Sequence, residues 1–117
     1  MDKQEFIEYI LNNYSTDEEH PWVQYPEHTV FRHRHNRKWF ALIMDIPKSK
    51  LGIKSEELVS VVNLKCGPVL VGSLIGKAGY YPAYHMNKSN WISLTLNGEV
   101  PDDEIKTMLD ISYDMTK

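Results

Sequence analysis

The fold is decided by residues 29–46, which read TVFRHRHNRKWFALIMDI. Residues 29–34 and 38–46 are rich in strand-forming side chains, and Asn36 between them suits a tight turn. The second run is apolar throughout residues 39–44, which is typical of a strand that is buried on both faces. The stretch therefore predicts a β-hairpin, and its second strand is expected to be covered on both sides.

Patterns on either side of the hairpin predict the remaining elements. Phe6, Tyr9 and Ile10 recur at helical spacing, so an amphipathic helix is expected near the N-terminus. Segments rich in β-branched side chains, or alternating in polarity, predict two more strands, and two prolines suit the first turns of helices. The expected elements are a helix over residues 2–13, strands over residues 58–66 and 91–96, a short helix over residues 68–75 and a last helix beginning at Pro101.

The order of these elements predicts the fold class. Strands joined by short turns favour an antiparallel sheet, and helices at both chain ends must bury their apolar sides against it. We expect an α+β two-layer sandwich, in which helices pack on one face of an antiparallel sheet. A chain of 117 residues suits a single domain over residues 1–117. The side chains expected to be largely buried are Phe6, Phe40, Leu42, Leu64, Leu94, Ile105 and Leu109.

Composition limits the class of protein. Hydrophobic residues make up 42% and charged residues 25% of the chain, close to the average of globular domains. The single cysteine, Cys66, excludes an internal disulfide and a zinc site of several cysteines, and is expected to be a buried, unreactive thiol. No secretory signal pattern and no apolar run of about 20 residues is present, so a cytoplasmic location is expected. The net charge of −3 argues mildly against tight non-specific DNA binding.

Four segments resemble one known family. They are VFRHRHNRKWFALIMDIPKSKLG (residues 30–52), VVNLKCGP (61–68), GYYPAYHMNKSNWISLTLNGEVPDDEI (79–105) and LDISYDM (109–115). In these segments the chain is similar to the MmcQ/YjbR family of small bacterial proteins. The resemblance implies a CyaY-like α+β fold and a double-wing protein that binds DNA. It supplies no catalytic residues.

The basic hairpin supports a nucleic-acid interpretation, in which the chain is a non-enzymatic domain that binds duplex DNA. In this interpretation the hairpin is a wing whose cationic side chains reach DNA phosphates. A second loop forms a rim next to it and adds polar contacts. The residues assigned to this surface are Arg32, Arg34, Arg37, Lys38, Asn87 and Lys88. The competing interpretation is a solvated sheet edge protected by charge. With a loop of two or four residues, Arg34 is expected opposite Trp39 as a cation–π pair.

An aromatic cluster supports a second function, from a different class. Tyr81, Tyr84, His85 and Trp91 predict a cleft around Tyr84 and Trp91 that binds a small molecule or a protein, with no nucleic-acid role. The same stretch also has a structural interpretation, because buried tyrosine and tryptophan need hydrogen bonds. His85 or Asn87 can also cap backbone groups there. Both interpretations remain open at this point.

Catalysis and metal binding have weaker support. Cys66 and His85 are a conceivable nucleophile pair, but no nearby charge activates the thiol. His33 and His35 share a face at strand spacing and lack a third ligand. The acidic runs at residues 17–19 and 102–104 are not assigned to iron. The second run is expected at the start of the last helix, where carboxylates interact favourably with the positive end of the helix dipole. The sequence therefore predicts no catalytic residue, metal site or cofactor, and the candidate partners are duplex DNA, a small molecule or a protein, rather than a membrane.

Overall fold

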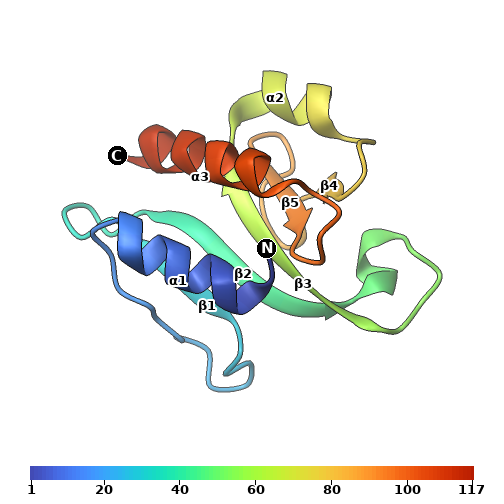
Figure 1. Cartoon of the computed structure of the whole chain (residues 1–117), viewed down its shortest axis with the longest axis horizontal. Coiled ribbons are helices and arrows are strands. Elements are labelled where there is room, and N and C mark those ends of the chain that lie inside the picture. The colour runs from blue at the N-terminus through green and yellow to red at the C-terminus, as the bar shows by residue number, and fades with distance from the viewer.

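A computed structural model describes all 117 residues as five strands and four helical segments. In chain order they are α1 (Lys3–Asn13), β1 (Thr29–Arg32), β2 (Trp39–Pro47), the 3-10 helix η1 (Lys48–Leu51), β3 (Leu58–Lys65), α2 (Gly67–Leu74), β4 (Tyr80–Pro82), β5 (Trp91–Thr95) and α3 (Asp102–Thr116) (Figure 1). The predicted α+β class is confirmed. None of the helices is both long and apolar enough to span a membrane.

The strands form one antiparallel sheet in the order β1-β2-β3-β5-β4. The hairpin of β1 and β2 was expected, and β2 and β3 are the longest strands at 9 and 8 residues. Strand β4 was not predicted, because three residues that end in a proline are too short to give an alternating pattern. Gly79 leads into β4 with a φ of 86°, and a Cβ there would lie 2.4 Å from a methyl carbon of Val100. This entry to the edge strand therefore requires glycine.

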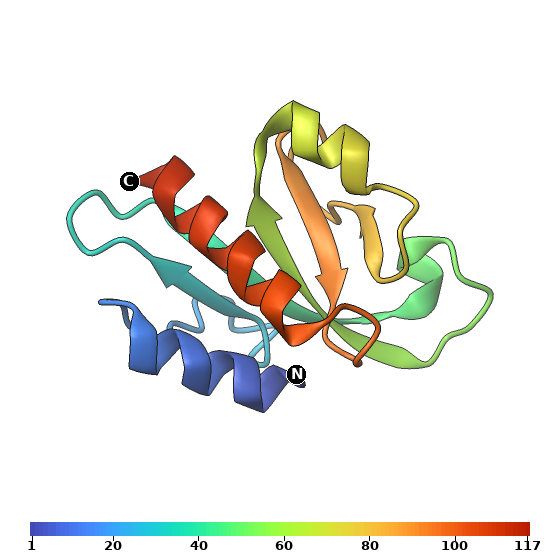
Figure 2. The same ribbon diagram turned by 45° about the horizontal axis from the view of Figure 1, so that its top comes forward.

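The helices cover one face of the sheet. Figures 1 and 2 show α1 and α3 side by side over the strands, and α2 covering the end near β5 and β4. Helix α1 begins with a capping box between Asp2 and Glu5, in which each side chain accepts a hydrogen bond from the other residue's backbone N–H. All seven side chains that were predicted to be buried are buried, and six of them belong to the core between helices and sheet.

A β-bulge decides which side chains of β2 face the helices. Phe31 pairs with Ala41, but Arg32 pairs with Trp39, so Phe40 is an extra residue on β2. Phe40 and Ala41 consequently both belong to the helix-side core. Trp39 packs instead with the apolar cluster of the opposite face, which we call the open face.

The open face is itself partly covered. Its apolar cluster consists of Val30, Leu42, Met44, Ile46, Val59 and Val61, all buried. None of α1, α2 and α3 packs there; the covering side chains come from η1, loops and strand ends, among them Leu51, Trp22 and Tyr84. The prediction that the second strand of the hairpin is buried on both faces is confirmed, and the loops that cover the open face build the site described next.

Candidate functional site

A pocket of about 560 Å³ lies on the open face. This volume falls within the range of about 300–1,000 Å³ that is usual for small-molecule sites. Its floor comes from β2, through Leu42, Met44 and Ile46. Two loops form its walls: residues 22–28, which precede the edge strand β1, and residues 84–86, which follow the edge strand β4. Loops from opposite edges of the sheet therefore enclose one space.

The first wall is a continuous series of rings. Trp22 meets Trp39 edge to face, with ring centroids 5.6 Å apart and an interplanar angle of 89°. On its other side Trp22 lies 6.1 Å from the ring of His28, at 76°. His28 in turn is stacked on Tyr25 at 4.8 Å and 8°. Such contacts hold aromatic rings in defined orientations, so this wall is a built surface rather than a loose loop.

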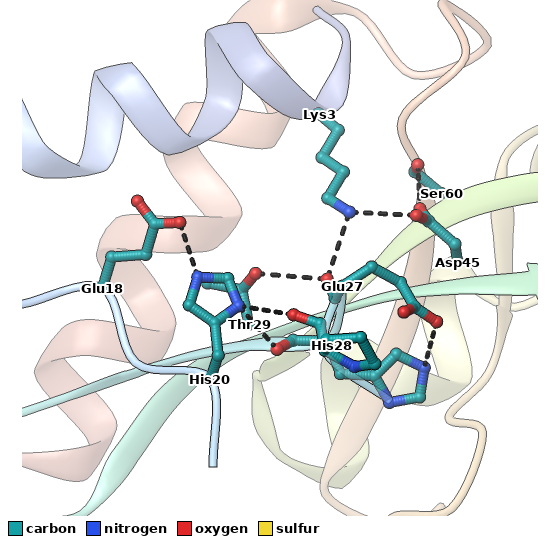
Figure 3. A network of polar contacts seen from close by, with 9 residues as sticks. Lys3, Glu18, His20, Glu27, His28, Thr29, Asp45 and Ser60 are labelled. Atoms are coloured by element: carbon teal, nitrogen blue, oxygen red, sulfur yellow. Dashed lines mark hydrogen bonds and ion pairs between the residues drawn. The ribbon is translucent and has the colours of Figure 1, made fainter. Parts of the chain in front are cut away.

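Hydrogen bonds to side chains outside the pocket fix the loop of residues 22–28. The Nδ1 atom of His20 lies 2.9 Å from the carbonyl oxygen of Pro26 and 3.1 Å from that of His28. Nε2 of the same ring lies 2.8 Å from the Glu18 carboxylate. Lys3 donates to the carbonyl oxygen of Glu27 at 3.1 Å (Figure 3). The loop is therefore tied to the preceding segment and to the start of α1.

The second wall is anchored through a buried polar pair on β3 and β5. Asn63 and Ser93 are paired across the sheet and both are fully buried. The Asn63 amide donates to the carbonyl oxygen of Tyr84 at 2.8 Å, and the backbone N–H of Tyr84 donates to the Ser93 hydroxyl at 3.1 Å. His85 follows with a φ of 59°, and its ring lies 3.9 Å from the ring of Tyr84. Both backbone polar groups of Tyr84 are thus hydrogen-bonded to side chains of β3 and β5.

Asp45 places a carboxylate at the edge of the pocket. It accepts hydrogen bonds from Lys3 at 2.9 Å and from Ser60 at 2.5 Å (Figure 3). Partial burial alone raises the pKa of Asp45, but the bonds from Ser60 and Lys3 outweigh it and hold the pKa below its ordinary value. Asp45 is therefore an ionised and already partnered acceptor at neutral pH.

His28 is kept neutral by its surroundings. Burial lowers its pKa below the ordinary value, and the nearby carboxylates of Glu27 and Asp45 offset that effect only in part. Its Nε2 atom lies 3.9 Å from the Glu27 carboxylate, beyond hydrogen-bond distance. At neutral pH the ring consequently offers one donor and one acceptor to the pocket.

The basic hairpin is faced by carboxylates from residues 17–19, which we call the acidic strap. Arg34 makes a two-pronged contact with Asp17, at 2.9 and 3.2 Å. Arg37 lies 3.2 Å from the Glu19 carboxylate. Arg32 lies 3.6 Å from the same carboxylate. The backbone of Glu19 also pairs with Val30 on the outer edge of β1, so the strap lies against the hairpin along its length.

The prediction that Arg34 forms a cation–π pair with Trp39 is wrong. Arg32 makes it instead, with its guanidinium carbon 5.7 Å from the Trp39 ring centre. Residues 33–38 form a six-residue loop, and the bulge at Phe40 shifts the register by one position. Both features move Arg34 away from the tryptophan and toward the strap.

Comparison with known proteins assigns the family. A family model described as YjbR matches residues 11–115. The chain belongs to the YjbR family. Its sequence is 32% identical to the uncharacterized protein YyaQ of Bacillus subtilis, over 100% of this chain and 99% of that protein. It is 34% identical to the uncharacterized protein YjbR of Escherichia coli over 62 residues, 52% of each chain.

A solved structure has the same fold as this YjbR-family domain. The crystal structure of a Pseudomonas syringae protein is similar to it with a TM-score of 0.97 and 48% identity, and the match covers 100% of both chains. The predicted family and the predicted arrangement of helices and sheet are therefore both confirmed.

The residues predicted for the aromatic cleft of the YjbR domain are only partly brought together. Tyr84 and His85 line the pocket. Tyr81 and Trp91 do not: they lie on β4 and β5, where they pair with Ser93 and Lys65, and neither lines the pocket. Two of the four predicted residues thus lie on one wall of the pocket, and none lies on the other.

The remaining predicted residues take structural or exposed positions. Asn87 accepts a hydrogen bond from the backbone N–H of Ser89 at 2.9 Å, as the structural interpretation expected. Lys38 and Lys88 are exposed and make no ion pair with any carboxylate. Cys66 is buried, and burial raises the pKa of its thiol. His33, only 1% exposed, is hydrogen-bonded at 2.8 Å to the Thr116 hydroxyl.

Sequence reasoning missed Trp22, Tyr25 and His28, which form the first wall. A signal was present, since residues 20–28 place a tryptophan, a tyrosine and two histidines in a segment between two elements. A purely solvated connector does not need large rings. Their number in so short a stretch marks a connector that packs on the domain.

Proposed function

We propose that this protein is a binding domain for a small molecule, and that the ligand occupies the pocket on the open face. One observation carries the proposal. Both wall loops are fixed by hydrogen bonds to side chains outside the pocket. His20 and Lys3 bond to the loop of residues 22–28, and Asn63 and Ser93 bond to Tyr84 in the other loop. Their rings therefore stand over the apolar floor of β2 and enclose about 560 Å³. Largely pre-formed, concave and aromatic-lined spaces are typical ligand sites.

Shape favours a small molecule over a protein partner. Protein interfaces of ordinary strength bury roughly 800 Å² on each side and extend over a broad surface. The groups that line this pocket converge instead on a single concavity, and eight of the 14 lining residues are hydrophobic. This combination of an apolar interior and a few polar groups suits an occupant that enters the space.

Duplex DNA is the second candidate, and the hairpin is the observation that favours it. The side chains of Arg34 and Arg37 are 57% and 56% exposed, although both are paired with carboxylates. A phosphate can replace a carboxylate in such a contact, because both accept bidentate hydrogen bonds from a guanidinium. This candidate ranks second because the strap carries opposing charge and the chain as a whole carries −3.

The test is a ligand screen read out residue by residue. Small aromatic and aliphatic compounds are added to the ¹⁵N-labelled protein, and we expect backbone amide shifts in residues 22–28, 84–86 and β2. The Trp22→Ala variant removes a wall ring and is expected to lose binding. Trp91→Ala is the matched control, since it removes the same side chain outside the pocket. Shifts confined to the hairpin, or no response to any compound, would contradict the proposal.

A further inference from the structure

The pocket's unengaged polar groups are mostly hydrogen-bond donors. The indole N–H groups of Trp22 and Trp39, the ammonium of Lys50 and the hydroxyls of Tyr25 and Tyr84 make no hydrogen bond or ion pair within the protein. Indole and ammonium groups can only donate, and phenol hydroxyls can do either. Neutral His28 adds one donor and one acceptor. On the acceptor side, Asp45 is already bonded to Lys3 and Ser60. Glu27, 3.9 Å from the His28 ring nitrogen, is the remaining carboxylate without a hydrogen bond.

From this imbalance we infer that the ligand is a planar aromatic molecule that carries a carboxylate. The inference rests on the proposed function and names the ligand class of the same site. Flat rings gain most from edge and face contacts with the tryptophans and tyrosines of the walls. The thioethers of Met44 and Met86, which also line the pocket, add favourable contacts with an aromatic ring. An acceptor-rich, anionic group on the ligand then satisfies the free donors.

Lys50 is the cation that meets the carboxylate. It is exposed on η1, and it lines the pocket together with Pro47, the last residue of β2. The neighbouring cations are already engaged, because Lys48 pairs with Glu57 at 2.6 Å and Lys3 pairs with Asp45 at 2.9 Å. Lys50 is therefore the lysine of the pocket lining, and it has no carboxylate partner within the protein. Glu27 also lines the pocket, and its negative charge opposes an anion, so removing that charge should strengthen binding.

Three probes with one ring system separate ring binding from charge recognition. They are 2-naphthoate, its neutral amide and the corresponding naphthylmethylammonium cation. We expect 2-naphthoate to bind about fivefold to tenfold more tightly than the amide, since one charge-assisted contact at a partly exposed site is worth on the order of 1 kcal/mol. The cation should bind most weakly. The advantage of the carboxylate should shrink as salt concentration rises.

Variants assign that preference to Lys50. Lys50→Gln should abolish the advantage of 2-naphthoate over the amide. Lys54→Gln is the matched control, because Lys54 is also exposed and without an ion pair but does not line the pocket. It should preserve the preference. Glu27→Gln should raise the affinity for 2-naphthoate by about twofold, and it leaves the backbone contact with Lys3 in place.

The outcomes distinguish this inference from the function on which it rests. Equal binding of the three probes, or tighter binding of the cation, with shifts in the pocket loops would overturn the carboxylate assignment and leave the binding domain intact. A carboxylate preference that survives in Lys50→Gln would also overturn the role given to Lys50. If none of the three probes shifts a pocket residue, the aromatic pocket is not a site for such ring systems, and the proposed function loses its support together with the inference.

Discussion

The side-chain amide of Asn63 donates a hydrogen bond to the backbone carbonyl oxygen of Tyr84, with 2.8 Å between nitrogen and oxygen. The two residues are 21 positions apart in the chain. Asn63 also accepts a hydrogen bond from the Ser93 hydroxyl at 2.5 Å, and that hydroxyl accepts one from the N–H of Tyr84. A polar cluster in the middle of an apolar sheet thus sets the position of one pocket wall, and each of its members depends on the others.

Replacing Asn63 by alanine should reduce both stability and binding. The change leaves the Tyr84 carbonyl and the Ser93 hydroxyl without their buried partner, and each such group costs about 1–3 kcal/mol. We expect the free energy of unfolding to fall by about 2–3 kcal/mol in urea titrations. Amide signals of residues 84–86 should also shift in the native protein.

Asn12→Ala provides the control for that experiment. Asn12 is exposed on α1 and contacts no pocket residue, so its replacement should leave the stability unchanged or raise it slightly. An Asn63→Ala protein with full stability and an unchanged loop would show that the buried cluster does not hold the pocket wall.

His33 should make the protein less stable in acid. Burial holds the pKa of His33 below its ordinary value of 6.5 in the folded protein, although a hydrogen bond to the Tyr113 backbone opposes this in part. The unfolded chain therefore takes up a proton at a higher pH than the folded chain does. The stabilising effect is complete above about pH 6.5 and is lost as the pH falls toward the folded pKa.

The measurement is the free energy of unfolding at pH 7 and at pH 5. The wild type should lose more stability over this interval than His33→Phe, which keeps a ring between Phe40 and Tyr113 but cannot titrate. His35→Phe, at an exposed position in the same loop, should behave like the wild type. An identical pH dependence in wild type and His33→Phe would exclude His33 as the source.

Much of the fold could be predicted because it depends on local patterns. The amphipathic spacing of α1 and the apolar run of β2 each identify an element without knowledge of its neighbours. Strand β4 has only three residues and therefore shows no such pattern. It is held in place by pairing with β5 and by the turn at Gly79. Register is likewise non-local. The bulge at Phe40 forms only when β1 is paired with β2, and it changed the expected partner of Trp39 from Arg34 to Arg32.

The site was harder to predict than the fold. Tyr84 and His85 lie in an aromatic cluster that is contiguous in sequence, so their position in the lining of a cleft could be predicted. Trp22 and Tyr25 reach the same pocket from a connector that packs over the open face, and periodicity gives no signal for such packing. The opposing charges of the strap and the hairpin were both visible in the sequence, but only the fold brings Asp17 to Arg34.

His20 should control the order of the first pocket wall. Its ring contacts two carbonyl oxygens of the loop through one nitrogen and Glu18 through the other (Figure 3). His20→Ala should lower the stability by only about 1 kcal/mol, because the ring is partly exposed. Backbone amides of residues 22–28 should exchange with solvent faster, and the affinity for pocket ligands should fall. His35→Ala should change neither quantity, and unchanged exchange in His20→Ala would show that the ring does not restrain the loop.

The last prediction concerns duplex DNA. Three hairpin arginines face carboxylates of the acidic strap, and the strap is held to β1 by backbone pairing between Glu19 and Val30. A phosphate must therefore compete with a carboxylate that is already in place. We expect no measurable binding of a short duplex by the wild type at about 150 mM salt, where electrostatic binding is strongly weakened.

Two double variants test whether the strap or the hairpin decides that result. Asp17→Asn with Glu19→Gln keeps the shape of the strap and removes two negative charges, so weak binding should become detectable at low salt. Its logarithmic affinity should decrease with salt by about 0.9 for each phosphate contact. Arg34→Ala with Arg37→Ala should show no binding at any salt concentration, with a thermal melting transition like that of the wild type. Tight binding by the wild type at 150 mM salt that disappears in the arginine variant would make the hairpin a DNA-binding wing after all, and would show that the strap yields to phosphate.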